Sequence, residues 1–343
     1  MHQVIAQPHP AILDPRQDLP LTERLLAWLP GPRWASQAGW IALPLLRALG
    51  TVAFLEWTGK NPLCWGLGLL VLPEALAFTY AVPHALWGAA RIAREASALE
   101  PRLAELTSAG QEPGPRVFRG MGSTLGPVLI ALSISLCLLG ATVGTADGWI
   151  VLALLLLALA IHLPITTLLW TYLMLMVGLH RLGARHLILE AYSGDGSLGL
   201  LPVGKLAFTG FWVFAANLAP LLLIGLTSLA SLVVGLVVFI AGVLVFFLSL
   251  WRVHGQMGRA RQHQLLRAQA LYEEAYAPLR TAYTLETLEA RSGLLGAAEA
   301  LERRAEAIQT WPFSDALLAR MVVIGLSVVT AILARLVMKP LGL

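Results

Sequence analysis

Long apolar runs are the feature that most limits what this chain can fold into. A helix rises about 1.5 Å per residue and the hydrocarbon core of a bilayer is about 30 Å thick, so a crossing needs about 20 apolar residues. Seven stretches are long enough: residues 38–57, 63–85, 124–145, 149–178, 206–226, 230–251 and 318–338. We therefore expect an all-α, polytopic membrane protein with about seven transmembrane helices.

The composition supports this expectation. Hydrophobic residues make up 57% of the 343 positions and charged residues only 13%, against about 45–50% and about 25% in soluble domains. Such a chain has too little polar surface to cover a water-soluble globule, so the lipid bilayer is its predicted environment. It also lacks the basic, aromatic-rich soluble domain that nucleic-acid binding requires, and no nucleic-acid partner is predicted.

The distribution of cations predicts the topology. Positive residues favour the cytoplasmic side of a membrane, and Trp favours both headgroup levels. With the N-terminus inside, the cytoplasmic segments hold most of the cations: Arg16, Arg24, Arg33, Arg91, Arg94, Arg102, Arg116, Arg119, Arg181, Arg185, Lys205 and the group from Arg252 through Arg304. The outer side keeps Lys60, Arg335 and Lys339. We expect a multi-pass protein of the bacterial cytoplasmic (inner) membrane with its N-terminus inside and its C-terminus outside.

The spans and connections predict six regions. In order, they are a cytoplasmic segment with an interfacial helix (1–37), a transmembrane hairpin (38–85), a basic cytoplasmic helix and flexible linker (86–123), four spans with a cytoplasmic loop at 179–205 (124–251), a cytoplasmic helical region (252–317) and a last span (318–343). Gly120, Gly122 and Gly126 in the linker only loosely resemble a phosphate-binding loop, since no Gly-Lys-Ser/Thr follows and no strand precedes them, so they predict a hinge.

The largest polar region contains two predicted helices. The first continues the sixth span with an apolar stripe and is broken at Pro278, and the second covers residues 284–308. The stripe consists of Leu265, Leu266, Ala268, Leu271 and Tyr272. Such helices can fold back as an antiparallel hairpin or pair with copies in neighbouring subunits, and self-association is the favoured alternative.

Four spans place a proline beside a polar residue near the centre of the bilayer. The pairs are Pro44 with Arg47, Pro73 with Glu74, His162 with Pro164, and Asn217 with Pro220. A charge at the centre costs about 2.5–3.5 kcal/mol on insertion scales, and a proline leaves a helix carbonyl without its donor. Arg47 and Glu74 lie at similar depths on consecutive spans, which predicts a buried ion pair. His162 and Asn217 either satisfy neighbouring backbone groups or line an ion pathway at broken helices.

Small residues and cysteines carry weaker signals. Gly140 and Gly144 form a Gly-x-x-x-Gly, and Gly235 and Gly242 share one side of the sixth span, which favours close helix packing inside one subunit. The two cysteines, Cys64 and Cys137, lie in different apolar stretches. They predict neither a disulfide nor a metal site, and no cofactor is expected.

Short motifs at the two ends resemble those of multi-pass bacterial membrane proteins to which no activity is assigned. The similarity lies in the Pro-Gly-Pro-Arg-Trp sequence at 30–34, the long basic helical loops and the Thr-Trp-Pro-Phe sequence at 310–313. The resemblance implies a membrane location and carries no function.

Three functions remain in competition. The favoured prediction is transport, by a channel or ion-coupled carrier, with Arg47, Glu74, His162 and Asn217 as the polar midplane and the cytoplasmic helices for assembly or gating. The alternative is a scaffold, sensor or assembly factor that recruits partners or anionic lipids through its Arg clusters, as a homo-oligomer or alone. An enzyme is not expected, because the chain has no His-Glu-x-x-His, no Gly-x-Ser-x-Gly and no paired aspartates.

Overall fold

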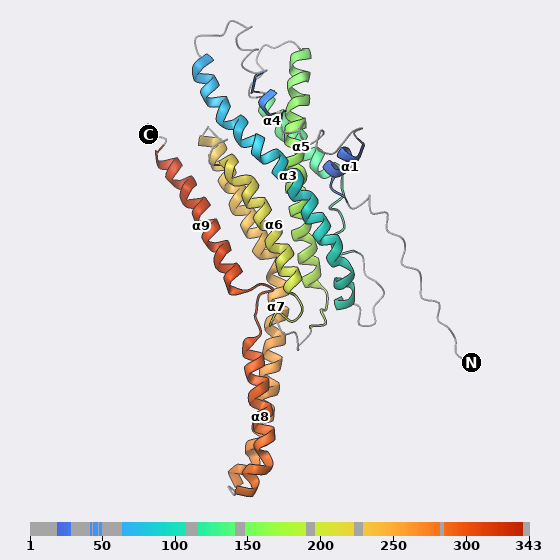
Figure 1. Ribbon diagram of the computed structural model, residues 1–343, viewed down its shortest axis with the longest axis vertical. Coiled ribbons are helices and arrows are strands. Elements are labelled where there is room, and N and C mark those ends of the chain that lie inside the picture. The colour runs from blue at the N-terminus through green and yellow to red at the C-terminus, as the bar shows by residue number, and fades with distance from the viewer. Residues whose placement is uncertain are drawn as a thin grey trace, which may run out of the picture. The chain divides into compact units, whose positions relative to one another are not determined.

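All regular secondary structure in the residues that the computed structural model describes is helical. These are residues 19–28, 42, 44–46, 48–49, 64–107, 116–140, 148–189, 196–222, 229–281 and 285–338, and none of them forms a strand. The helices are α1 (Leu21–Trp28), α3 (Cys64–Thr107), α4 (Leu125–Gly140), α5 (Gly148–Ala184), α6 (Leu201–Pro220), α7 (Leu229–Thr281), α8 (Leu285–Ala307) and α9 (Asp315–Met338) (Figure 1). The predicted all-α class is confirmed for these ranges.

Four of the described helices are long and apolar enough to cross a membrane. They cover Val151–Ala184, Leu201–Pro220, Leu232–Ala277 and Ala316–Ala334, and a shorter apolar helix covers Leu125–Cys137. Their outward faces carry large apolar side chains, among them Val234 of α7 and Leu326 of α9, which are 62% and 65% exposed. Because lipid tails solvate such surfaces and water does not, these helices indicate a membrane protein.

The chain divides into two compact units. The first comprises Met1–Ser97 and Arg119–Met174, and the second comprises Ala98–Phe118 and Leu175–Leu343. Each unit is described by itself.

In the first unit, α1 packs onto α3 and α5. Leu26 of α1 joins Val82 and Leu86 of α3 and Ile161 of α5 in one buried cluster. Leu21 is also buried, whereas Leu25 is exposed. The short helix predicted to lie at the membrane interface is therefore held by its leucines against other helices of the protein.

The glycine segment before α4 forms a packed turn, and the predicted hinge is wrong for its described residues. Gly120 has a φ of +105° and its carbonyl oxygen accepts a hydrogen bond of 3.0 Å from Trp170 Nε1. Arg24 donates to the carbonyl oxygen of Gly122. A Cβ atom at Gly126 would overlap the Trp170 ring. The glycines are needed for a positive φ and for close approach to an aromatic ring.

In the second unit, α6, α8 and α9 each pack against α7. Gly242 of α7 lies against the ring of Phe214 in α6, and a Cβ atom there would overlap that ring. This contact is the packing inside one subunit that was expected for Gly242. Gly140 ends α4, while Gly144 lies outside the described residues.

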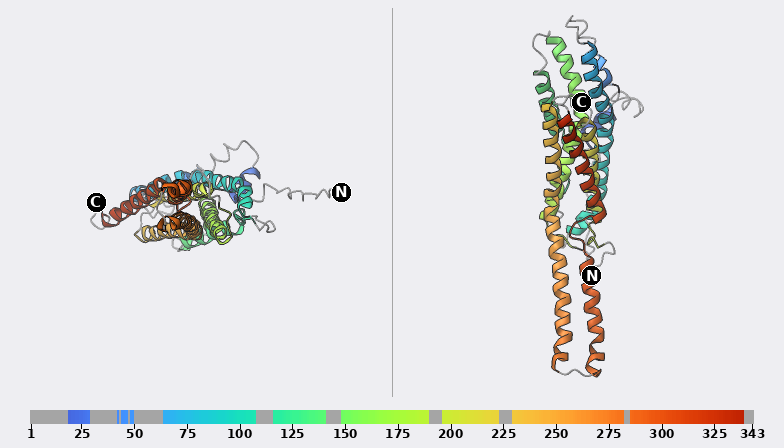
Figure 2. Two further views of the ribbon diagram at one scale, coloured as in Figure 1. Left: turned by 90° about the horizontal axis from the view of Figure 1, so that it is seen from below. Right: turned by 90° about the vertical axis from the view of Figure 1, so that its left-hand side faces the viewer.

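Helix α7 is a single helix of 53 residues, so the predicted break at Pro278 is wrong. The helix continues past Pro278 to Thr281, because a proline removes only one hydrogen-bond donor and the last turn of a helix can still form after it. Helix α8 runs antiparallel beside the second half of α7, and the pair extends beyond α6 and α9 (Figures 1 and 2). We call this pair, residues 252–281 with 285–307, the arm.

Several predicted boundaries differ from the observed helices. Helix α6 begins at Leu201 and not at 206, which places Lys205 inside the helix and not in the loop. The hydroxyl of Ser197 accepts the backbone N–H of Leu201 at 3.0 Å, and Pro202 follows in the first turn. These two features start a helix regardless of hydropathy. Similarly, α3 continues unbroken through Pro73 and Pro83 across the predicted boundary at 85.

The loop between α8 and α9 packs on the start of α6. Gly204 contacts this loop so closely that a Cβ atom would overlap the carbonyl oxygen of Pro312. The adjacent Phe313 is buried against Phe246 of α7, with ring centroids 6.1 Å apart. The Thr-Trp-Pro-Phe motif therefore joins α6, α7 and α9.

We expect Gly204→Ala to destabilise the protein by roughly 1–3 kcal/mol, because the backbone of 312 must shift to admit the methyl group. The measurement is the unfolding temperature of the purified protein in detergent. Gly258→Ala is the matched control, since nothing lies within 4 Å of its Cβ position, and alanine stabilises a helix relative to glycine. Equal effects of the two substitutions would contradict the close contact.

Candidate functional site

A buried serine–histidine pair links α4 and α5 in the first unit. Ser135 Oγ lies 3.2 Å from Nδ1 of His162. Ser135 is fully buried and His162 is 6% exposed. The ring of Phe78 in α3 meets the imidazole edge-on, with centroids 5.8 Å apart. Both partners can donate or accept a hydrogen bond, so this contact joins two apolar helices through buried polar side chains.

The sequence around this pair contains a proline and two threonines. Pro164 sits inside α5 two residues after His162 and has no N–H to donate to the preceding turn. Threonine hydroxyls bind carbonyls nearby: Thr166 Oγ1 donates to the carbonyl oxygen of His162 at 3.1 Å, and Thr167 Oγ1 to that of Leu163 at 2.7 Å. These bonds satisfy the threonine hydroxyls locally and leave the imidazole to pair with another helix.

The predicted midplane residues have different outcomes. His162 belongs to the first unit and Asn217, buried in α6, to the second. Pro220 is the last residue of α6. Pro44 is buried in helical backbone, but Arg47 lies outside the described residues.

The second predicted pair of residues lies on α3. Pro73 and Glu74 are helical there, but the described part of the structure does not extend to their side chains. The ion pair between Arg47 and Glu74 therefore stays a prediction.

Ser135 was not identified from the sequence. It lies 27 residues before His162, among apolar residues and other serines that carry no distinguishing pattern. Ser133, two residues earlier, is exposed and binds the carbonyl oxygen of Leu129 in its own helix. The two serines lie on different faces of α4, and only the face with Ser135 meets His162. Which face meets α5 is decided by the packing of the two helices.

The arm is closed by alanines. Two alanines on each helix have at most 1% of their surface exposed: Ala268 and Ala275 of α7, and Ala298 and Ala305 of α8. The two alanines of each helix are seven residues apart. A heptad of small residues lets two helices approach closely. Tyr272 donates a hydrogen bond of 3.0 Å to Glu302 across the arm. Of the predicted apolar stripe, Ala268 is buried and Leu265, Leu271 and Tyr272 are half-buried, whereas Leu266 is 56% exposed.

The side chain of Gln256, at the base of the arm, forms hydrogen bonds with the backbone at the end of α5. Gln256 Nε2 donates to the carbonyl oxygens of Gly183 at 2.8 Å and Arg185 at 2.6 Å. Its Oε1 accepts the N–H of Leu187 at 3.3 Å. The last carbonyls of a helix have no partner in the helix itself, so Gln256 caps α5 from another element.

A histidine ties the same base to the loop before α9. His254 Nδ1 lies 2.7 Å from the carbonyl oxygen of Thr310 and therefore donates to it. The imidazole stacks on Trp311 at a centroid distance of 4.3 Å. Gln256 and His254 thus hold the arm at its base through hydrogen bonds and ring stacking.

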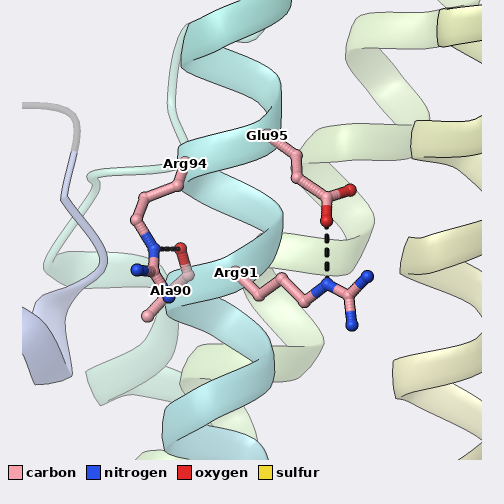
Figure 3. Close-up of polar contacts among 4 residues, drawn as sticks. All are labelled: Ala90, Arg91, Arg94 and Glu95. Carbon is pink, nitrogen blue, oxygen red and sulfur yellow. Dashed lines mark hydrogen bonds and ion pairs between the residues drawn. The ribbon is translucent and has the colours of Figure 1, made fainter.

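The described basic residues of α3 are partly neutralised within their own helix (Figure 3). Arg91 Nε lies 2.8 Å from Glu95 Oε1, and its guanidinium lies 5.1 Å from the centre of the Trp87 ring. Arg94 Nε donates to the carbonyl oxygen of Ala90 at 3.2 Å. The arrangement places an aromatic ring and a cation on one helix face, as at a membrane–water boundary.

Among the described residues, no group of three or more His, Cys, Asp or Glu side chains could hold a metal ion. Comparisons with protein-family profiles, with curated proteins and with solved structures find no match for this chain.

We expect Gln256→Ala to destabilise the protein by about 1–3 kcal/mol, because three partly buried backbone groups lose their partner. Hydrogen exchange at Leu187 should rise at the same time. Gln262→Ala is the control, because Gln262 is an exposed residue of the same helix. Unchanged exchange at Leu187 in Gln256→Ala would show that the capping bond is unimportant.

Proposed function

We propose that the protein is a membrane-embedded scaffold that presents the arm to soluble partners in the cytoplasm. The observation that carries the proposal is the continuity of α7. One helix of 53 residues contains both an apolar segment and the polar half of the arm. A continuous helix transmits position and orientation with little bending, so the arm stands in a defined direction relative to the membrane.

The surfaces of the arm suit such a role. Its contact between helices contains fully buried alanines of both α7 and α8, so the two helices of the arm cover each other within one chain. Its outer surface is polar and charged. The base is held by Gln256 and His254, which favours a rigid projection over a swinging one.

The proposed topology places the arm inside the cell. Seven spans with the N-terminus inside put residues 252–317 in the cytoplasm and the C-terminus outside, in the inner membrane of a bacterium. The support is the excess of arginines in the arm and in the other even-numbered connections. Arg91 and Trp87 of α3 would then lie at the inner headgroup level, where anionic lipids are proposed partners.

The scaffold proposal predicts contacts to soluble protein from the arm alone. A photo-reactive amino acid at Gln262 or Gln269, both exposed on α7, should give discrete cross-linked adducts with a soluble protein in living cells. The same residue at Val323 or Leu326 of α9, which are 63% and 65% exposed, should react with lipid and give no such adduct. Adducts from α9 and none from the arm would refute the proposal.

Transport is a second candidate because of the pair formed by Ser135 and His162. A titratable imidazole is costly inside a membrane and is favoured where protons move. The pair lies between two helices and beside Pro164, near the polar residues at which carriers place their ion sites. The arm would then gate or assemble the carrier.

Reconstituted liposomes test this second candidate. Proton flux through the wild-type protein should fall by about tenfold or more in His162→Gln and Ser135→Ala, since general acid–base groups contribute at least that much to proton transfer. Ser133→Ala, an exposed serine on the same helix, should keep the wild-type flux. Absence of flux in the wild type, or equal flux in all variants, would exclude transport by this route.

A further inference from the structure

The α7 side of the base of the arm carries cations and no carboxylate. Between Arg252 and Tyr272 the sequence has four arginines and two histidines and neither Asp nor Glu. The loop beside it, from Ile308 to Ser314, also has no acidic residue. On α7, acidic residues begin again at Glu273, and the neighbouring α8 places Glu302 beside Tyr272 and continues to Glu306.

Four of these cationic or titratable residues form one line on α7. Arg252, Arg259, His263 and Arg267 follow one another at intervals of seven, four and four residues, which places them on one face of a helix. All four are exposed. We call this line the basic stripe.

The arginines of the basic stripe differ in their ion pairing from other described arginines. Elsewhere in the chain, Arg91 pairs with Glu95 and Arg303 with Glu299 four residues away. Within the described ranges, none of the four stripe residues makes an ion pair with a carboxylate. The guanidinium groups of the stripe are therefore available to carboxylates of a partner.

The length of the stripe decides between a lipid surface and a protein partner. Its ends are 15 residues apart, which corresponds to about 22 Å along a helix. The field of an anionic membrane is screened within about 8 Å at physiological salt. Because the stripe starts directly after the apolar part of α7, headgroups reach the Arg252 end and leave Arg259, His263 and Arg267 to another partner.

The neighbouring side chains narrow the chemistry of that partner. Leu266 lies within the stripe and is 56% exposed, so the partner requires an apolar side chain as well as carboxylates. A second copy of the arm does not fit, because the outer face of α8 mixes Glu299 with Arg303 and Arg304. Arginine guanidinium groups bind carboxylates through two parallel hydrogen bonds.

We propose that the basic stripe is the docking site for an acidic helical segment of a soluble protein, about 15 residues or more in length. Its carboxylates would pair with the arginines on one face, and an apolar residue would cover Leu266. This inference rests on the proposed scaffold function, since it names the surface of the arm to which the soluble partner binds.

The test uses the full-length protein in nanodiscs of zwitterionic lipid. The probe is a fluorescent helical peptide of about 18 residues with Glu at the same seven-, four- and four-residue intervals and one Leu between them. Arg259→Gln combined with Arg267→Gln should weaken binding about tenfold or more, since two charge-assisted contacts are lost. The control, Arg303→Gln combined with Arg304→Gln, removes the same charge from the same arm and should change binding less than about twofold.

Several results would overturn the inference. Equal losses in the two double variants would show attraction to net charge alone. A DNA duplex that binds through the stripe while the acidic peptide does not would assign the stripe to nucleic acid. Loss of peptide binding in nanodiscs of anionic lipid, with full binding in zwitterionic ones, would assign it to the membrane surface.

Cross-linking separates this inference from the scaffold proposal. If adducts from Gln269 persist in cells that carry the Arg259→Gln, Arg267→Gln variant, the scaffold function stands and the basic stripe is not its docking site. If adducts are absent from wild-type cells while the peptide still binds through the stripe, the stripe chemistry stands and the scaffold function fails.

Discussion

Close packing against α7 is the constraint on which the second unit depends. Helices α6, α8 and α9 all contact it, and the tightest contacts occur where one partner is small: Gly242 under the Phe214 ring, Gly183 against the backbone of Val253, and the alanines of the arm. Lipid provides little hydrophobic drive between apolar helices, so dispersion forces at short range must hold them. Small residues at these points are therefore structural requirements.

Several hydroxyl groups inside the apolar helices form hydrogen bonds with backbone carbonyls of their own helix. Thr167, Thr171 and Ser249 each donate to a carbonyl three or four residues earlier. Such bonds place polar side chains in apolar surroundings at low cost. Two of the described buried contacts join different helices: Ser249 of α7 also lies 3.2 Å from Met176 Sδ of α5, and Ser135 of α4 lies 3.2 Å from His162 Nδ1 of α5. The transport hypothesis centres on the second contact, because it contains an imidazole.

The two candidate functions depend on different parts of the molecule. Transport requires the buried pair between α4 and α5, whereas the scaffold requires the arm, its fixed base and its uncompensated cations. In the arm, α7 and α8 contact each other through alanines and carry charged residues on their outer surface. Such a pair of helices covers its own contact, and its charged side chains stay available to a partner. The geometry of the second unit therefore supports the scaffold more directly than the buried pair supports a carrier.

The sequence by itself determined the all-helical class, the approximate positions of the apolar helices from α4 to α9, and His162 as an unusual buried residue. These follow from hydropathy and helix length, which are properties of local sequence. It misplaced the start of α6 and the end of α7, and it assigned Leu266, which is exposed, to the apolar stripe of the arm. It also missed Ser135 and Gln256 and interpreted the glycines before α4 as a hinge. Only the tertiary structure decided these points, because each depends on which face of a helix meets another element, and a shift of one residue turns a helix face by about 100°.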